Sequence, residues 1–172
     1  MSELQLLRCA QGVWTGEHRI WFTPTSPAAR STSQAMVLAS RKQAAVAVAL
    51  RWATDRQDYD ATLLLRSNPE DRRFYGRWAG SHPRLPRNIV LRGGASSRHG
   101  IMLHGEDGDR PWEITIGRIT HEVAVTVYDL AASRPELPVM HAAYPTRLLN
   151  VRLVGDRATA IPPLKRTCAT DP

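Results

Sequence analysis

Short stretches in which apolar and polar residues alternate recur along this chain about every ten residues, and this pattern constrains the fold most strongly. Turn-forming pairs such as Asn68-Pro69 and Asp107-Gly108 separate the stretches. No amphipathic helix longer than a turn or two is apparent. The pattern predicts an all-β, antiparallel barrel or sandwich. The expected strands are 12–22, 34–40, 44–54, 59–67, 72–80, 88–92, 100–105, 110–119, 120–130 and 137–147, with 150–154 as a further candidate.

The segment 44–54 has two chemically different faces. Large apolar residues occupy every second position from Val46 to Trp52, and alanine fills most of the positions between them. In a strand, these two sets point to opposite sides of the sheet. Two arrangements fit the pattern. Either the large residues fill the interior of a barrel, or the alanines line a cavity that is kept open for a ligand.

The chain of 172 residues is long enough for one domain with a substantial core. We expect a barrel domain over 1–150 that begins with a short helix or turn. A C-terminal extension over 151–172 is expected to add at most one strand before a mobile tail. The N-terminus lacks a signal-peptide pattern, and no apolar run approaches the roughly 18 residues that cross a bilayer. A cytoplasmic location without a membrane partner is therefore expected.

The two cysteines, Cys9 and Cys168, lie near opposite ends of the sequence. Two cysteines alone do not establish a bridge, and reduced thiols are the default in the cytosol. We therefore expect two unrelated thiols, and a disulfide bond between them stays an open alternative.

The net charge of +7 and a pI near 10.2 raise the question of a nucleic-acid partner. The basic residues are nearly all arginines, with Lys42 and Lys165 as the only lysines, and they are scattered along the whole chain. A scattered distribution indicates coding bias rather than a binding stripe. The segment 84–98 is the one place where a basic patch could form, and a solvated loop is the simpler interpretation. Nucleic-acid binding through surface arginines is kept only as a further alternative.

The first expected strand opens with the sequence Gly-Val-Trp-Thr-Gly, in which Gly12, Trp14 and Gly16 are spaced by one residue. This opening, followed by a run of short strands, resembles the start of lipocalin-like (calycin) barrels. Within that group, the chain resembles the small bacterial nitrobindin-like and fatty-acid-binding-protein-like barrels, over about 10–148. The resemblance implies a single up-and-down antiparallel barrel of about 8–10 strands. It also implies that Trp14 packs across the closed end against a late-strand arginine, for which Arg147 is the first match and Arg152 the second.

The residues themselves indicate no cofactor and no metal, because no zinc or calcium ligand spacing occurs. The nitrobindin-like resemblance implies one alternative, a heme whose axial ligand is His141. The chain departs from that pattern in two places. His18 stands where those chains usually carry a third glycine, and Pro145 is expected to bend or end the strand that contains His141.

The primary functional hypothesis is a binding protein for a small, mostly apolar ligand held inside the barrel. Apolar burial would supply the affinity, and a few inward polar side chains would orient the ligand. The residues expected to contact the ligand are Trp14, His18, Arg51, Trp52, Tyr128 and His141.

The alternative hypothesis is a small barrel enzyme acting on a buried substrate, an isomerase, cyclase or hydratase. His18 or His141 would then serve as the acid/base. Each histidine also has a structural interpretation, as a side chain hydrogen-bonded to a neighbour. The sequence contains no complete catalytic motif and does not decide between binding and catalysis. The sequence also leaves open whether the protein forms a homodimer.

Overall fold

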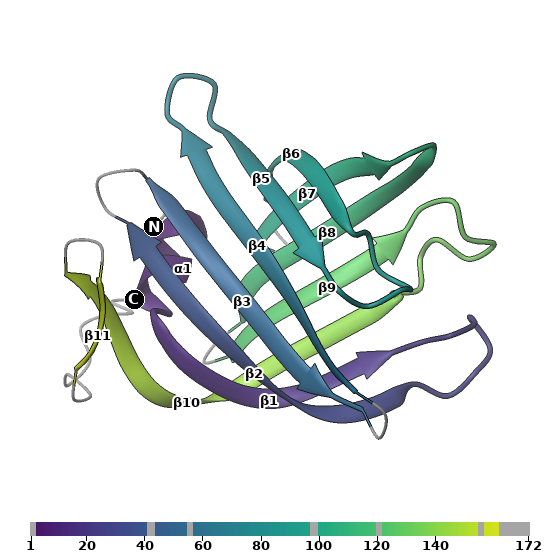
Figure 1. Cartoon of the computed structure of the whole chain (residues 1–172). Helices are drawn as coiled ribbons and strands as arrows, with labels where there is room; N and C mark the ends of the chain where they lie inside the picture. The colour runs from purple at the N-terminus through teal and green to yellow at the C-terminus, as the bar shows by residue number, and fades with distance from the viewer. Residues whose placement is uncertain are drawn as a thin grey trace.

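The computed structural model describes residues 3–40, 44–54, 57–96, 100–119, 122–154 and 157–161. Its elements in chain order are α1 (Glu3–Cys9), β1 (Gly12–Ile20), β2 (Ala29–Ser40), β3 (Ala45–Ala53), β4 (Asp58–Asn68), β5 (Arg73–Gly80), β6 (Asn88–Ser96), β7 (Gly100–Asp107), β8 (Arg110–Ile119), β9 (Glu122–Asp129), β10 (Met140–Val154) and β11 (Arg157–Ile161). Ten antiparallel strands follow one another around a closed barrel, because β1 pairs with β10 as well as with β2 (Figure 1). The predicted all-β, up-and-down barrel with a short N-terminal helix is confirmed. β11 pairs with the end of β10.

The alternation along β3 decides which of its faces is inside. Val46, Val48, Leu50 and Trp52 are each at most 2% exposed, so the large side chains face the interior. The alanines between them therefore face outward. The arrangement in which alanines line an internal cavity is wrong, and large apolar side chains fill this part of the barrel.

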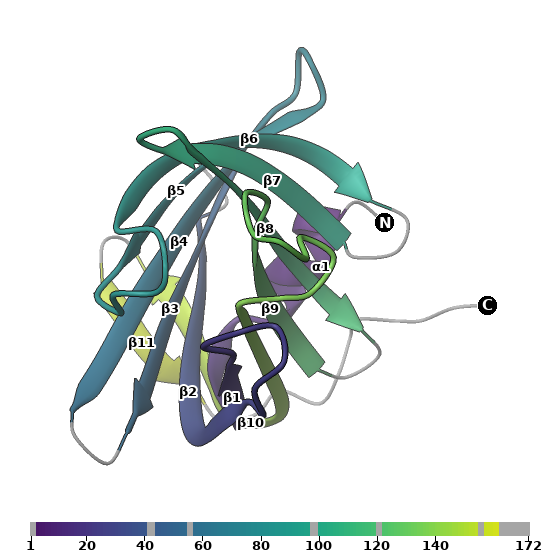
Figure 2. The same cartoon turned by 90° about the vertical axis from the view of Figure 1, so that its right-hand side faces the viewer.

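One end of the barrel, which we call the base, is covered by α1. Leu7 in this helix and Ala10 just after it are 1% and 0% exposed. The helix contacts β2 and β3 on one wall and β7 and β8 on the other (Figure 2). Its apolar side therefore completes the core at the base. No helix among the described residues is long and apolar enough to span a membrane.

The opposite end, which we call the mouth, carries the connections 21–28, 81–87 and 130–139 (Figures 1 and 2). The connection 81–87 is packed into the opening, since His82 and Leu85 are each 3% exposed. Nε1 of Trp78 donates a hydrogen bond of 2.8 Å to the carbonyl oxygen of Pro86. This bond fixes the connection to the wall of the barrel.

The β1–β10 seam contains a β-bulge. Gly16 of β1 lies opposite two residues of β10, Tyr144 and Pro145. A Cβ atom on Gly16 would lie 1.8 Å from the carbonyl oxygen of Ala143, so only glycine fits there. Because the bulge leaves one residue outside the ladder, a proline without an N–H is tolerated. The strand does not end at Pro145 and continues to Val154.

Three other expectations differ from the structure. β2 begins at Ala29, five residues before the expected strand, because the polar segment 29–33 pairs fully with β1. The glycine-containing segment 93–96, which lies beyond the expected strand 88–92, belongs to β6. Cys9 is disulfide-bonded rather than a free thiol, which contradicts the expectation of two unrelated thiols. Cys168 lies outside the described residues.

Candidate functional site at the mouth

Three of the six side chains expected to contact a ligand face the interior of the barrel. Trp14, His18 and Trp52 are 3%, 1% and 2% exposed. Trp14 lies at the base, whereas His18 and Trp52 lie toward the mouth, at the far ends of β1 and β3. Of the predicted set, the structure brings His18 and Trp52 together inside the barrel.

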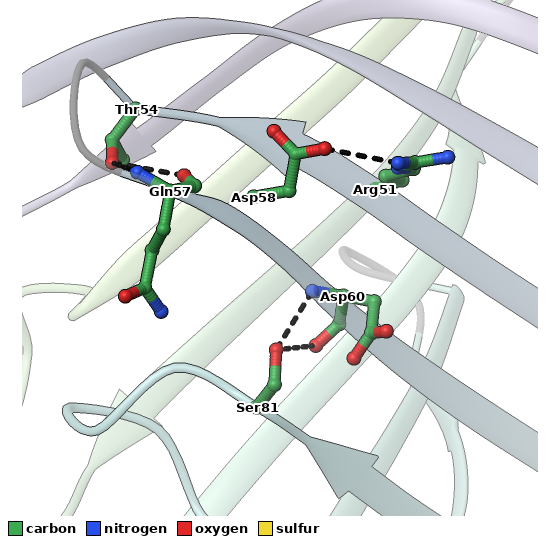
Figure 3. Close-up of polar contacts among 6 residues, drawn as sticks. All are labelled: Arg51, Thr54, Gln57, Asp58, Asp60 and Ser81. Atoms are coloured by element: carbon green, nitrogen blue, oxygen red, sulfur yellow. Dashed lines mark hydrogen bonds and ion pairs between the residues drawn. The ribbon is translucent and has the colours of Figure 1, made fainter.

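The other three side chains, Arg51, Tyr128 and His141, lie on the outer face. The expectation that they point inward is wrong, because each one neighbours a fully buried residue on its strand and alternation turns it outward. Arg51 forms an exposed ion pair of 2.9 Å with Asp58 (Figure 3). The backbone of Asp60, further along β4, is held by the hydroxyl of Ser81 in the same view.

His141 lies in a small groove on the outer face of β8, β9 and β10. Its Nδ1 atom is 2.9 Å from Oγ1 of Thr126, and Tyr128 lines the same groove. The groove has a volume of about 200 Å³, below the range of about 300–1,000 Å³ that is typical of small-molecule sites. A heme with His141 as its axial ligand does not fit, because this histidine lies outside the barrel in a groove too small for a porphyrin.

Four aromatic side chains meet beneath the connection 81–87, and we call His18, Trp52, Tyr59 and His82 the mouth cluster. The rings of His18 and Trp52 are stacked, with centroids 4.2 Å apart and planes 13° from parallel. Tyr59 and His82 meet edge to face with centroids 4.5 Å apart. Trp52 joins the two pairs, at 6.0 Å from Tyr59 and 6.3 Å from His82. The cluster combines side chains from three strands, β1, β3 and β4, and from one connection into one aromatic surface.

His82 belongs to this cluster although no sequence pattern indicated it. It lies in an irregular connection, where strand alternation carries no information about which way a side chain points. Its Nδ1 atom accepts a hydrogen bond of 3.2 Å from the backbone N–H of Arg84. This bond sets the orientation of the ring and makes Nδ1 the acceptor, so that the neutral ring carries its proton on Nε2.

Both histidines of the cluster are neutral at pH 7. Burial, together with the nearby His82, lowers the pKa of His18 to about 4. Burial and the neighbouring Arg84 also lower the pKa of His82. A neutral imidazole offers one donor and one acceptor nitrogen, which suits hydrogen bonding to a neutral ligand group. As a general base at pH 7, a histidine with a pKa near 4 is weak.

Three buried nitrogen atoms at the mouth have no hydrogen-bond partner among the described residues. They are Nε2 of His18, Nε1 of Trp52 and Nε1 of Trp112. Their side chains are 1%, 2% and 3% exposed. A buried polar group without a partner costs about 1–3 kcal/mol of stability, so such groups are rare in folded proteins. The indole N–H groups of Trp52 and Trp112 only donate, and they require acceptor atoms.

A second polar group lies beside the cluster on the interior wall. Ser33, which pairs with Trp52 across β2 and β3, donates a hydrogen bond of 3.0 Å to the carbonyl oxygen of Arg51. The hydroxyl of Tyr144 is 2.8 Å from the same Ser33 oxygen and therefore donates to it. Burial raises the pKa of Tyr144 to about 12. These groups satisfy one another, and the alternation Met140, Ala142, Tyr144 was the sequence signal for the inward tyrosine.

The interior of the barrel is closely filled by side chains. Inward residues from opposite walls, such as Val48 on β3 and Ile114 on β8, are 0% exposed. Two surface grooves of the described residues lie on the outer face, at His141 and beside Arg30 on β2. A molecule bound at the mouth must therefore displace side chains or part of the connection 81–87. No group of three His, Cys, Asp or Glu side chains within the described part of the chain is placed to hold a metal ion.

No protein-family model matches the chain, and no curated protein is significantly similar to it in sequence. The closed ten-stranded barrel is compatible with ligand binding, and the functional argument depends on the geometry of the mouth.

Proposed function

We propose that this protein binds a small, mostly apolar molecule at the mouth of the barrel, and that the molecule carries hydrogen-bond acceptors for the buried nitrogens there. The observation that carries the proposal is the stack of His18 on Trp52, in which Nε2 of one ring and Nε1 of the other are buried without partners. The resemblance to lipocalin-like barrels, which hold apolar ligands, supports the same function from the sequence.

The energetic argument concerns the unpartnered donors. Each costs the folded protein about 1–3 kcal/mol when it is buried without an acceptor. A bound carbonyl or carboxylate oxygen that meets Trp52 or Trp112 recovers this free energy, which then appears as binding affinity. The surrounding aromatic rings supply apolar contact area for the rest of the ligand. The site therefore selects molecules with an apolar body and acceptor atoms at one end.

Access to the site depends on the connection 81–87. His82 and Leu85 fill the opening. The hydroxyl of Ser81 attaches the connection to β4, because it donates a hydrogen bond of 3.1 Å to the carbonyl oxygen of Asp60 and accepts one of 2.8 Å from the N–H of Asp60 (Figure 3). At its outer edge, the Arg84 guanidinium lies 6.0 Å from the ring of Phe22 in the connection 21–28, a weak contact at an exposed position. We infer that ligand uptake displaces this connection while β4 stays in place.

The enzyme alternative receives less support from the same residues. His141 lies outside the barrel, and the low pKa of His18 leaves it a poor proton acceptor at neutral pH. Tyr144 and Ser33 are satisfied by each other and by the backbone. The mouth therefore offers recognition groups rather than a matched acid and base.

The test has two parts. Native mass spectrometry of freshly purified protein is expected to reveal a co-purified small molecule in a fraction of the barrels. In parallel, fluorescence titration with anilinonaphthalene sulfonate, an apolar probe with acceptor oxygens, is expected to show saturable binding to the folded protein. Absence of both a co-purified molecule and saturable probe binding would refute the proposal.

Two matched variants locate the site. Trp52→Phe keeps the stacked ring and removes an unpartnered N–H, and we expect probe affinity to fall about tenfold while stability is kept or increased. Trp14→Phe is the control, because the Nε1 of Trp14 already donates a bond of 2.7 Å to the carbonyl oxygen of Ala10 at the base. It should lower stability and leave probe affinity unchanged. Equal affinity in wild type and Trp52→Phe would exclude the mouth as the site.

A further inference from the structure

The outer face of β2, β3 and β4 is unusually apolar for the outside of an antiparallel barrel. The outward side chains of Ala45, Ala47 and Ala49 form what we call the alanine strip, along the middle of the three strands. Met36 on β2 and Leu64 on β4 flank the strip and are 37% and 50% exposed. An antiparallel sheet with one solvent-facing side normally places polar residues there. Contiguous apolar residues on an outer face mark an interaction surface.

The strand register shows that these residues are direct neighbours. Leu38 of β2 pairs with Ala47, which pairs in turn with Leu64 of β4, so the three form one row across the sheet. The three strands lie side by side in the barrel wall (Figure 1). Because alanine is short, the longer side chains of Leu38 and Leu64 rise on either side of a low strip. Such a surface accepts projecting side chains from a partner.

The charges on β4 are separated along the same face. Its outward charged residues are Asp58 and Asp60 toward the mouth and Arg66 toward the base. Asp58 is paired with Arg51, but the carboxylate of Asp60 makes none of the contacts drawn in Figure 3, where only its backbone bonds to Ser81. Arg66 takes part in no ion pair among the described residues. Among the described residues, one end of the face therefore carries a carboxylate without an ion-pair partner, and the other end carries a guanidinium without one.

We propose that this face is the contact surface of a two-fold symmetric homodimer. A two-fold axis that lies between the two copies and crosses β4 at Leu63 reverses the strand direction in the second copy. Asp60 of each copy then faces Arg66 of the other, since both lie three residues from Leu63, and Leu64 of each copy lies over Thr62 of the other. The alanine strips of the two copies face each other beside these contacts. The same surface is thus complementary to itself in charge. The inference is independent of what the mouth binds.

Sedimentation analysis of the intact protein over a wide range of concentrations tests the proposal. The wild type is expected to show a reversible equilibrium between monomer and dimer. Ala47→Arg places a long charged side chain on the strip and is expected to raise the dimer dissociation constant about tenfold or more. Leu130→Arg, at a residue 37% exposed in the connection 130–139, is the matched control and should leave the dimer unchanged.

A charge exchange tests the symmetry itself. Asp60→Arg and Arg66→Asp, each alone, place like charges against one another in both halves of a two-fold interface, and both variants should dissociate more readily. The double variant restores opposite charges in both halves, and its dimer dissociation constant should return toward that of the wild type. Failure of the double variant to recover would overturn the two-fold arrangement.

Folding is controlled by the thermal midpoint and near-ultraviolet circular dichroism of every variant. If Ala47→Arg lowers the midpoint, Leu64→Glu serves in its place, because this side chain is half exposed. A wild type that stays monomeric at all concentrations would overturn the proposal. A dimer whose dissociation constant is changed by neither Ala47→Arg nor Leu64→Glu would also overturn the proposal. Monomeric protein whose binding to a single-stranded oligonucleotide depends on Arg66 would instead assign the face to an anionic partner.

Discussion

The guanidinium of Arg147 lies 4.6 Å from the centre of the Trp14 ring. The two residues are directly opposite each other across the seam where β1 and β10 close the barrel. Arg147 also donates a hydrogen bond of 2.6 Å to the carbonyl oxygen of Cys9, and Nε1 of Trp14 donates one of 2.7 Å to that of Ala10. This pair therefore joins the barrel seam to the end of α1 through a cation–π contact and two hydrogen bonds.

Arg147→Met is expected to lower the free energy of unfolding by about 1–3 kcal/mol, because it removes the cation–π contact and the bond to Cys9 together. Urea unfolding followed by tryptophan fluorescence measures the change. Arg134→Met is the control, since among the described residues Arg134 forms an exposed pair with Glu136, and such pairs contribute less than about 1 kcal/mol. Equal losses in the two variants would contradict a special role for the Trp14–Arg147 contact.

Gly93→Ala and Gly94→Ala differ by one position on β6 and are expected to behave oppositely. A Cβ atom on Gly93 would lie 1.8 Å from the carbonyl oxygen of Met102 on β7, whereas one on Gly94 meets nothing within 4 Å. Forcing the two strands apart should cost about 1–3 kcal/mol or more. Gly94→Ala should be neutral or stabilising by up to about 1 kcal/mol, because it restricts the unfolded chain.

Thermal and urea unfolding of the two alanine variants provide the measurement, and each variant serves as the other's control. A Gly93→Ala protein as stable as the wild type would show that the β6–β7 pair is looser than its register indicates.

The strands could be predicted from sequence wherever one face of the strand is buried and the other is exposed to solvent. β4 is such a case, since buried and exposed positions alternate through Ala61, Leu63 and Leu65. The expected contact between Trp14 and a late-strand arginine is also present, with the first match, Arg147. The residues of β3 alone do not show which of its two faces is inside the barrel. The expectation that Arg51 points inward required the alanine face to be inside, and it is wrong because the face with the large apolar residues is inside.

Tyr128 and His141 lie on a part of the outer face that is itself partly covered. Ala124 and Thr126 point outward yet are only 8% and 9% exposed, so burial does not separate the two faces of β9, although Val123, Val125 and Val127 alternate along its sequence. His82 was missed for a different reason. Its inward direction is imposed by the packing of an irregular connection, which depends on contacts with β3 and β4 rather than on local pattern.

Arg110→Leu is expected to destabilise the mouth by leaving a buried carboxylate without its cation. The side chain of Asp129 is 3% exposed and pairs with Arg110, whose guanidinium also lies 5.3 Å from the ring of Trp112. Because Arg110 itself is half exposed, the free energy of unfolding is expected to fall by about 1–3 kcal/mol, which is less than for a fully buried pair. Adding Asp129→Asn should recover part of it, and a double-mutant cycle from urea unfolding gives the coupling. Additive losses would argue against a coupled pair.

Protein stability is expected to fall as the pH decreases from about 6.5 toward 4, because His18 must stay neutral in the folded state. Its pKa is about 4 when folded and near 6.5 as a free side chain. Between these values the unfolded chain binds the proton more readily, so the stabilisation present above pH 6.5 is lost on acidification. At pH 5 the loss from this residue is on the order of 2 kcal/mol. The lowered pKa of His82 acts in the same direction.

His18→Phe isolates the contribution of this one residue, because it keeps a ring against Trp52 and cannot be protonated. We expect the variant to be at least as stable as the wild type at pH 5, since it also removes the unpartnered Nε2 atom from the core. Between pH 7.5 and pH 5 its unfolding free energy should decrease by less than that of the wild type, with the remaining dependence due to His82 and the surface carboxylates. Urea unfolding at the two pH values provides the comparison. An identical pH dependence in both proteins would mean that His18 accepts a proton as easily in the barrel as in water, and that the mouth is open to solvent.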